Sequence, residues 1–359
     1  MKTISTIFAV ASFILIGLSL NDSKSYRPTP LQFTVPAGWP QPLYDFKKNP
    51  ITEQGFQLGR KLFYDGRLSR DNNFSCASCH QQFVAFATYD HNVSHGFNNS
   101  FTKRNAPALF NLAWQKEFMW DGGINHLDAQ PLAPITDTVE MAETIPDVLN
   151  KLKADAGYRK MFKAAFGDTV INTQRMTKAL SQFLLMMVSS SSKYDRVMRG
   201  KDSFNLPQRL GYGIFNQKCI SCHTPPMFTD YSYRNTGFAL DDFLKDYGRM
   251  KITGNPADSL KFKVPALRNA QVSFPYMHDG RVNSLLNVMN HYRQSIINGP
   301  TTDSLLQKGI PLSNFEIGQL TAFIYTLTDS AFLKDTRFAP PGYETRMQQT
   351  PQQDVHNFK

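Results

Sequence analysis

The order of apolar and polar positions along the chain predicts a mainly helical protein. Residues 176–188 place apolar side chains three and four positions apart, which is the spacing of one buried helix face. Another apolar stripe follows Ser313-x-x-Glu316, a capping box that indicates the start of a helix. Alternating apolar and polar residues, which would indicate half-buried strands, are scarce. We therefore expect an α-helical fold with long loops.

The N-terminal segment has the pattern of a secretory signal. Lys2 precedes an apolar stretch over residues 7–20, and polar residues follow at 21–24. The stretch is short for a membrane-spanning helix, which needs about 20 apolar residues. Because no small-residue cleavage site stands out, two interpretations remain. Residues 1–24 are a signal peptide for export to the periplasm, or they stay attached as a membrane anchor.

The chain contains the same arrangement twice. Each copy has an apolar segment with an internal glycine, a C-x-x-C-H unit, a Pro-Ala-Leu-x-Asn segment and an Asp-Gly turn. In order, the first copy has them at 58–63, 76–80, 107–111 and 121–122, and the second at 210–215, 219–223, 265–269 and 279–280. Duplication predicts two domains of similar build. We expect them at 25–198 and 199–340, with a linker over 199–207 and a C-terminal tail over 341–359.

Charge and cysteine content narrow the possible functions. The 39 Lys+Arg and 29 Asp+Glu residues give a formal net charge of +10, but no long basic run is present. We therefore expect no nucleic-acid partner. All four cysteines lie in the two C-x-x-C-H units, so an exported form of this chain would have no disulfide framework.

The C-x-x-C-H sequence is the attachment signature of haem c, in which two thiols bond to the porphyrin and the histidine ligates iron. The two units predict one haem at Cys76, Cys79 and His80, and a second at Cys219, Cys222 and His223. Zinc would need four ligands brought together, yet the two pairs are far apart in the chain and each has its own histidine. A redox dithiol would need a βαβ context that the sequence does not provide.

Short motifs accompany the two haem units, at positions 68–70, 104–107, 120–122, 140–141, 264–269 and 275–280. With these motifs the chain resembles the bacterial di-haem cytochrome c peroxidase/MauG family, from about residue 43 to residue 327. The resemblance implies two tandem cytochrome c-like haem domains with long loops. It also implies that the N-terminal haem reacts with hydrogen peroxide and that the C-terminal haem transfers electrons.

The same resemblance implies three catalytic residues. Glu140 and Gln130 match the residues on the open side of the peroxide haem, and Trp120 matches a tryptophan between the haems. A carboxylate beside an open iron position can move a proton between the two oxygens of peroxide. Outside such a motif, a glutamate at a helix end is commonly solvated and a tryptophan commonly belongs to the core.

The second axial ligand of each haem has more than one candidate. His95 resembles the loop histidine that caps the peroxide haem in the fully oxidised family enzyme, and His91 is the other possibility in this loop. For the second haem, family peroxidases have a methionine at the position of Tyr292, whereas the MauG branch has a tyrosine. Met289 is the alternative ligand in this chain.

The resemblance further implies a calcium ion between the domains. Its ligands would be the side chain of Asn105 and the carbonyl oxygens of Ser273 and Pro275, since calcium prefers oxygen donors. The implied partners are hydrogen peroxide and a small exported electron donor, either a cytochrome c or a cupredoxin. A homodimer is compatible with the family but is not indicated by the sequence.

The expected function is therefore that of a cytochrome c peroxidase. The alternative is a MauG-like enzyme, which uses the same haem chemistry to oxidise side chains of a partner protein. The candidate distal ligand Tyr292 favours this alternative, whereas the loop that contains His95 favours the peroxidase. A di-haem electron carrier without turnover is a third class, and it would have no use for Gln130 and Glu140.

Overall fold

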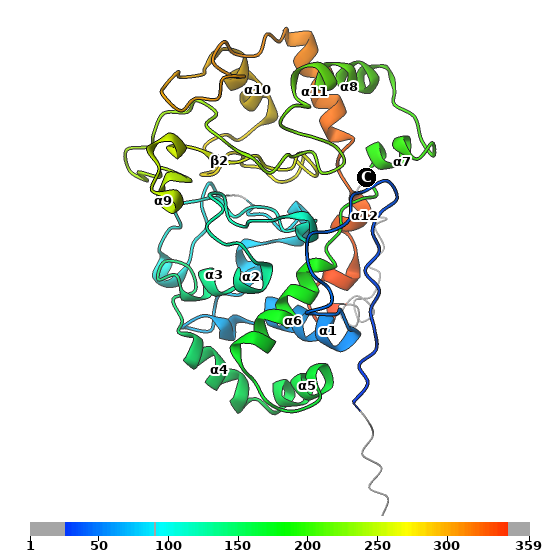
Figure 1. Ribbon diagram of the computed structural model, residues 1–359, viewed down its shortest axis with the longest axis vertical. Helices are drawn as coiled ribbons and strands as arrows, with labels where there is room; N and C mark the ends of the chain where they lie inside the picture. The colour runs from blue at the N-terminus through cyan, green and yellow to red at the C-terminus, as the bar shows by residue number, and fades with distance from the viewer. Residues whose placement is uncertain (1–25, 90, 344–359) are drawn as a thin grey trace, which may run out of the picture.

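The computed structural model describes residues 26–89 and 91–343 (Figure 1). The expected signal segment over 1–24 and most of the expected tail over 341–359 lie outside the described residues. Within the described ranges, no helix is both long enough and apolar enough to cross a membrane.

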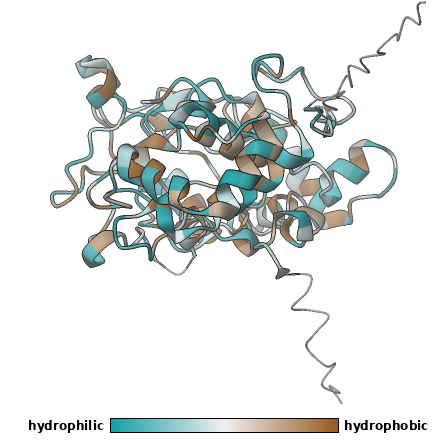
Figure 2. Ribbon diagram, turned by 90° about the horizontal axis from the view of Figure 1, so that it is seen from below, coloured by the Kyte–Doolittle hydropathy of each residue, from teal (hydrophilic) through white to brown (hydrophobic). Residues whose placement is uncertain are grey.

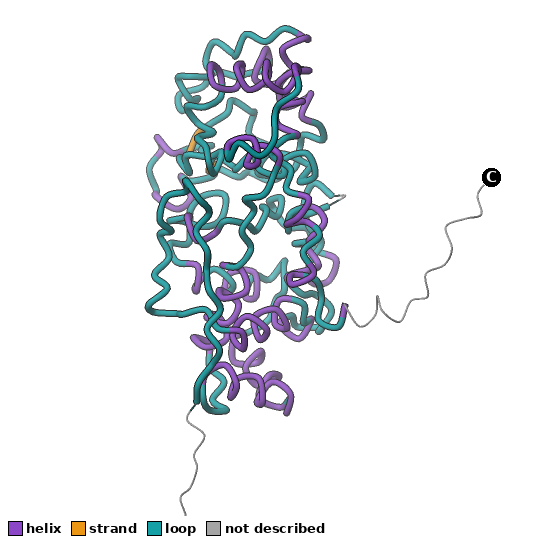
Figure 3. The backbone as a smooth tube through the Cα atoms, turned by 90° about the vertical axis from the view of Figure 1, so that its right-hand side faces the viewer, coloured by secondary structure: helices purple, strands orange, loops and turns teal. Residues whose placement is uncertain are grey.

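The protein is mainly helical, as the sequence predicts, and Figure 3 shows long loops between the helices. The described helices are α1 (Glu53–Phe63), α2 (Cys76–Cys79), α3 (Leu132–Thr136), α4 (Ile145–Ala154), α5 (Ala156–Phe166), α6 (Thr173–Leu185), α7 (Lys193–Met198), α8 (Leu206–Lys218), α9 (Met250–Thr253), α10 (Leu285–Gln294), α11 (Asn314–Tyr325) and α12 (Ser330–Leu333). Strands β1 (Tyr233–Arg234) and β2 (Phe262–Lys263) pair antiparallel. Short 3-10 helices connect several of these elements.

The helices form two groups at opposite ends of an elongated molecule (Figure 1). Helices α1, α4, α5 and α6 lie at one end, and α8, α10 and α11 at the other. Each group has its own cluster of buried apolar side chains. Figure 2 shows hydrophobic and hydrophilic residues next to each other along single helices, because each helix buries one face and exposes the other.

Local sequence signals explain where several helices begin. The Ser313 hydroxyl accepts a hydrogen bond from the Glu316 backbone N–H, and the Glu316 carboxylate accepts one from the Ser313 N–H, so the predicted capping box is confirmed. Asn205 caps α8 in the same reciprocal way with Gln208. The core helix predicted over 176–188 is α6, which begins and ends about three residues earlier.

A close contact between two helices occurs once in each copy of the duplicated arrangement. Helix α1 packs on α6, and α8 packs on α11. A Cβ atom on Gly59 would lie 1.9 Å from the carbonyl oxygen of Ala179, and one on Gly211 would lie 2.0 Å from that of Gln319. Glycine is therefore required at both positions, because only its missing side chain lets the backbones approach this closely.

The end of the described chain returns from the second helix group to the first. Phe332 and Phe338 are buried in the core around α1 and α6. The Arg60 side chain in α1 donates hydrogen bonds to the carbonyl oxygens of Thr336, Ala339 and Pro340. The domain expected over 199–340 therefore includes a terminal segment, from α12 onward, that packs on the other half.

Candidate active site

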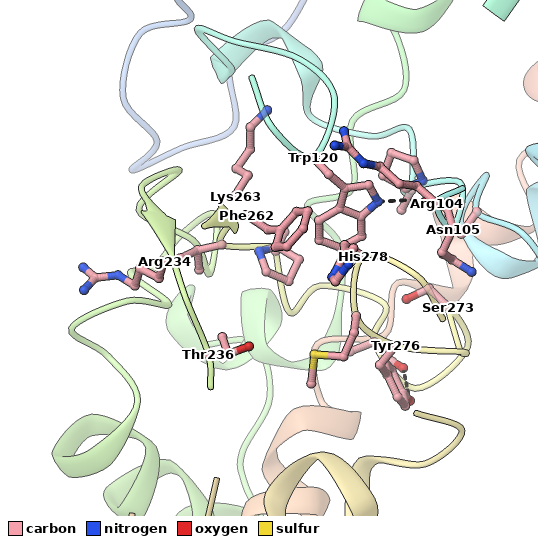
Figure 4. Close-up of a pocket in the computed structure, with 18 of the residues that line it drawn as sticks. Arg104, Asn105, Trp120, Arg234, Thr236, Phe262, Lys263, Ser273, Tyr276 and His278 are labelled. Atoms are coloured by element: carbon pink, nitrogen blue, oxygen red, sulfur yellow. Dashed lines mark hydrogen bonds between the residues drawn. The ribbon is translucent and has the colours of Figure 1, made fainter. Parts of the chain in front are cut away.

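A cavity of about 1300 Å³ is lined by residues from both halves of the molecule (Figure 4). Single small-molecule sites commonly measure ~300–1000 Å³, so this cavity is larger than one such site requires. Its lining includes residues of both C-x-x-C-H units, namely Cys79, His80, Cys219, Cys222 and His223. Cys76 is not part of the lining, but it belongs to the same short helix α2 as Cys79. All four thiols are free of disulfides.

The two histidines of these units are held in the same way. The Nδ1–H of His80 donates to the carbonyl oxygen of Phe86 at 2.7 Å, and that of His223 donates to the carbonyl oxygen of Phe228 at 3.2 Å. Burial lowers the pKa of both rings, and it lowers that of His80 to about 4. A neutral imidazole whose Nδ1–H is engaged keeps Nε2 as a lone-pair donor, which is how proteins orient histidines that bind metals. The donor set fits two haems c.

Glu140 and Gln130 both line the cavity. Burial, and then the negative charge of Asp137, raise the pKa of Glu140 to about 7. Burial raises the pKa of Cys79 as well, and the charge of Glu140 adds to that increase, which places Glu140 close to the first unit. The Gln130 side-chain amide donates to the sulfur of Met119 at 3.8 Å. Both residues expected beside the peroxide haem therefore line the cavity, and their catalytic roles stay a prediction.

Trp120 lies where the two halves meet in the cavity (Figure 4). Its indole N–H donates to the carbonyl oxygen of Asn105 at 2.9 Å, and its own carbonyl oxygen accepts from the backbone N–H of Lys263 at 2.7 Å. The N–H of Asn105 in turn donates to the carbonyl oxygen of His278 at 2.7 Å. His278 occupies the position in the second copy that Trp120 occupies in the first, so the backbone N–H and C=O of one residue, Asn105, connect the two equivalent residues.

Both candidate ligands for the second haem line the cavity, but their surroundings differ. Burial raises the pKa of the Tyr292 hydroxyl, and the nearby thiols of Cys222 and Cys219 raise it further, so this hydroxyl lies close to the second unit. The sulfur of Met289 accepts a hydrogen bond from the Thr321 hydroxyl at 3.8 Å. The Tyr292 hydroxyl thus lies near the second unit, and the distal ligand of the second haem stays a prediction.

His95 is not among the residues that line the cavity. Its Nδ1 is hydrogen-bonded to the side-chain oxygen of Asn99 at 2.9 Å, and its ring lies 4.4 Å from that of Phe101 and 4.9 Å from that of His91. The loop nevertheless touches the candidate active site, because the backbone N–H of Phe97 donates to the carbonyl oxygen of Glu140 at 2.7 Å. The expected capping role of His95 remains a prediction.

The three expected calcium ligands, Asn105, Ser273 and Pro275, all line the cavity. The side-chain N–H of Asn105 donates to the carbonyl oxygen of Asn92 at 3.0 Å, which leaves its amide oxygen as a donor for a cation. Oxygen donors of this kind fit calcium. Among the described residues, no group of three or more histidine, cysteine, aspartate or glutamate side chains is arranged to hold a metal ion.

Two charged residues of the site have no role in the sequence-based interpretation. Arg104 donates to Asp246 at 2.5 and 2.8 Å and to Asp121 at 2.5 Å, and so joins the two halves. Lys263 is only 9% exposed, burial lowers its pKa to about 8, and its ammonium donates to the carbonyl oxygen of Glu117. Their partners are far away in the chain, and no local pattern marks such pairs.

Two C-x-x-C-H units at one cavity fit a di-haem cytochrome c protein, and the chain belongs to the di-haem cytochrome c peroxidase/MauG family. The family model described as di-haem cytochrome c peroxidase matches residues 53–203. The methylamine utilization protein MauG of Methylophilus methylotrophus is 33% identical over 84% of this chain and 89% of its own length. The cytochrome c551 peroxidase of Nitrosomonas europaea is 33% identical over 76% of this chain and 79% of its own.

A solved structure agrees with these sequence comparisons. The crystal structure of a MauG-like protein associated with microbial copper homeostasis matches 87% of this chain and 99% of its own length. It has a TM-score of 0.79 and 31% sequence identity. Relatives therefore include both MauG proteins and peroxidases.

Proposed function

We propose that this protein is an exported di-haem enzyme of the MauG type, which uses hydrogen peroxide to oxidise side chains of a partner protein. The observation that carries the proposal is the placement of Tyr292, which lines the cavity close to Cys219 and Cys222. The sulfur of Met289, by contrast, accepts a hydrogen bond from the Thr321 hydroxyl. A phenolate ligand stabilises ferric iron relative to a thioether. That property suits a haem that gives up electrons to a strong oxidant at the other site.

Haem bound at His80 would supply the redox chemistry with peroxide. Glu140 would accept the proton from one peroxide oxygen and deliver it to the other, a task that suits a carboxyl group with a pKa near neutrality. Gln130 would orient the peroxide through its amide group, and Trp120 would lie on the electron path between the haems. A calcium ion at Asn105, Ser273 and Pro275 would hold the two halves in register.

The test is to replace Tyr292 by phenylalanine and by methionine. We expect both variants to keep two haems, while the reduction potential of the second haem rises and its ferric electron paramagnetic resonance (EPR) spectrum changes. In the methionine variant the spectrum should resemble that of a His/Met cytochrome. Peroxide-driven oxidation of a partner protein should fall. An unchanged potential and spectrum in both variants would refute this assignment.

Tyr276 provides a matched control, because it is another half-buried tyrosine that lines the same cavity. Its hydroxyl already donates to the carbonyl oxygen of Ala270 at 2.7 Å. Tyr276→Phe should therefore leave the potential and the spectrum of the second haem unchanged. A change as large as that in Tyr292→Phe would mean that loss of any tyrosine hydroxyl perturbs this site.

The second candidate function is that of a cytochrome c peroxidase. It is favoured by the similarity to the Nitrosomonas europaea peroxidase and by the loop that contains His95, in which the backbone N–H of Phe97 donates a hydrogen bond to the carbonyl oxygen of Glu140. Electrons would then come from a small exported cytochrome c or cupredoxin. Steady-state peroxide reduction with reduced cytochrome c distinguishes the two functions, since the MauG type should turn over slowly with this donor.

A further inference from the structure

A buried ion pair contacts the turn that follows the second C-x-x-C-H unit. Arg268 has 0% of its surface exposed and Asp195 has 5%. The guanidinium donates two parallel hydrogen bonds to the two carboxylate oxygens, at 2.8 and 2.7 Å. Asp195 lies in α7 and also accepts from the backbone N–H and the hydroxyl of Ser192, at 2.9 and 2.6 Å. Both charges are therefore fully paired and fixed in position.

Arg268 also contacts the turn that orients His223. Its Nε–H donates to the carbonyl oxygen of Pro226 at 2.8 Å, and its guanidinium lies 5.6 Å from the centre of the Phe228 ring. The backbone N–H of Leu267, the residue before Arg268, donates to the carbonyl oxygen of Phe228 at 3.2 Å. That oxygen is the acceptor for the Nδ1–H of His223. The ion pair thus fixes the group that holds this histidine.

The first copy lacks this arrangement. In its Pro-Ala-Leu-x-Asn segment the position of Arg268 is taken by Phe110, whose ring lies 6.1 Å from that of Phe332. His80 instead has a shorter hydrogen bond, 2.7 Å, to the carbonyl oxygen of Phe86. The duplicated fold can therefore be built with an apolar residue at this position. Since a buried ion pair seldom stabilises a protein more than apolar side chains of similar size, stability alone does not account for Arg268 and Asp195.

We infer that Asp195 and Arg268 are positioning residues for His223 and that their balanced charges set the reduction potential of the haem at the second unit. The inference rests on the proposed function only in requiring a haem at His223. A hydrogen bond to Nδ1 controls the orientation and the donor strength of an axial histidine. A fixed charge in a low-dielectric interior acts strongly on the charge of a nearby iron.

Single substitutions that leave one charge behind should move this potential in opposite directions. Asp195→Asn leaves the guanidinium unbalanced, which favours the ferrous form and raises the potential of the second haem. Arg268→Gln leaves the carboxylate unbalanced, which favours the ferric form and lowers the potential. The double variant restores neutrality, so its potential should return towards that of the wild type. The first haem should shift less than the second in every variant.

The measurement is a spectroelectrochemical titration of the holoprotein, with haem content and ferric EPR spectra recorded for each variant. Glu143→Gln is a matched control, because Glu143 is a buried carboxylate paired with Lys151 in the first half, and it should leave the second haem unchanged. If Arg268→Gln does not mature, Arg268→Lys keeps the charge and loses the paired hydrogen bonds. It should keep the potential close to that of the wild type but change the EPR spectrum of the second haem.

The inference would be overturned if Asp195→Asn and Arg268→Gln shifted the potential of the second haem in the same direction. Lost packing can move the potential the same way in both variants, whereas opposite unbalanced charges cannot. Equal shifts of both haems, or none, would overturn it as well. Peroxide-dependent oxidation by the wild-type protein is measured separately. Wild-type activity together with unmoved potentials would reject the role of the ion pair and keep the proposed function. Opposite shifts of the potential in a protein whose wild type has no such activity would keep the role of the ion pair and reject the proposed function.

Discussion

Glu140 combines a position in the cavity wall with a pKa of about 7. A carboxyl group with the ordinary pKa of about 4.3 would hold almost no protons at neutral pH. At a pKa near 7 the group can both take up a proton and release it near the working pH, which is the condition for efficient general acid–base catalysis. Burial is the main cause, so the effect depends on the shape of the cavity rather than on any single neighbour.

Glu140→Gln should slow the reaction of the holoprotein with peroxide by about 10²–10⁴-fold, because the proton carrier is removed while both haem sites remain. In the wild type the rate should rise with pH through about 7, as the carboxyl group loses its proton and becomes a base. The variant should lack this rise. Stopped-flow spectra recorded from pH 5 to 9 measure both effects, and haem content is the control for maturation.

Asp137→Asn offers a finer test of the same carboxyl group. Asp137 is exposed, and its negative charge is the second cause of the raised pKa of Glu140. Its removal should move the rise in rate to lower pH and leave the maximal rate unchanged. A rate that stays constant across this range in the wild type, or a rise that persists in Glu140→Gln, would assign the proton transfer to another group.

At the scale of single residues, the sequence could predict the haem attachment residues but not the residues that hold them in place. Two thiols and a histidine within five positions form a local pattern, and every cysteine and histidine of the two units except Cys76 lines the cavity. Glu140 was indicated only by the resemblance to a family. Arg268 and Asp195 are separated by a long stretch of chain, and no spacing rule connects them. His95 lies outside the cavity lining because Asn99 and Phe101 hold its ring elsewhere.

The helices of each half depend on one close contact of backbones. Gly211 in α8 faces α11, where a Cβ would lie 2.0 Å from the carbonyl oxygen of Gln319 and 2.9 Å from Cβ of Phe323. Gly213, two positions further in the same helix, has no atom within 4 Å of its ideal Cβ. Substitutions at Gly211 and Gly213 can therefore distinguish two effects of glycine, the space it leaves for a neighbouring helix and the conformational freedom it loses on folding.

Gly211→Ala should destabilise the protein by about 1–3 kcal/mol, because the added methyl group forces α8 and α11 apart. Gly213→Ala should stabilise it by roughly 0.5–1 kcal/mol, because alanine loses less conformational freedom in a helix. Denaturant unfolding followed by circular dichroism measures both. Equal effects of the two substitutions would show that the contact between α8 and α11 is looser than the structure indicates.

Elements follow from sequence where their signals are local. The capping boxes at Ser313 and Asn205 fix the starts of α11 and α8 within one turn, and both form as reciprocal hydrogen bonds. The predicted helix over 176–188 begins instead after the cap residue Asn172, and residues after Leu185 leave the helix although they remain apolar. Apolar spacing marks a buried face but not the point where the backbone turns away.

The whole molecule is held together by segments that cross between the halves. After α11 the chain returns to the first core, where Phe338 lies 5.8 Å from Phe332, 6.1 Å from Phe183 and 6.4 Å from Phe86, measured between ring centres. The carbonyl oxygen of Phe86 is also the acceptor for His80. Sequence could not show this return, since the duplicated motifs end before it and a short apolar segment matches either core.

Phe338→Ala should therefore destabilise the N-terminal half, although Phe338 follows the C-terminal half in the sequence. Phe338 is only 2% exposed, and removing a buried phenylalanine ring typically costs about 3–5 kcal/mol. We expect the first haem to lose its native EPR spectrum at a lower denaturant concentration than in the wild type, because the ring supports Phe86 and, through it, His80.

Phe315→Ala is the matched control, since Phe315 is 75% exposed and its loss should change stability by less than about 0.5 kcal/mol. Separate EPR signals of the two ferric haems show which half responds first as denaturant is added to Phe338→Ala. An earlier loss of the second haem signal, with the first unaffected, would place the terminal segment with the C-terminal half after all. If both signals shift together, the two halves unfold as one cooperative unit that is joined by this segment and by Arg104. The loss in the free energy of unfolding should then still be about 3–5 kcal/mol, the range for a buried phenylalanine ring.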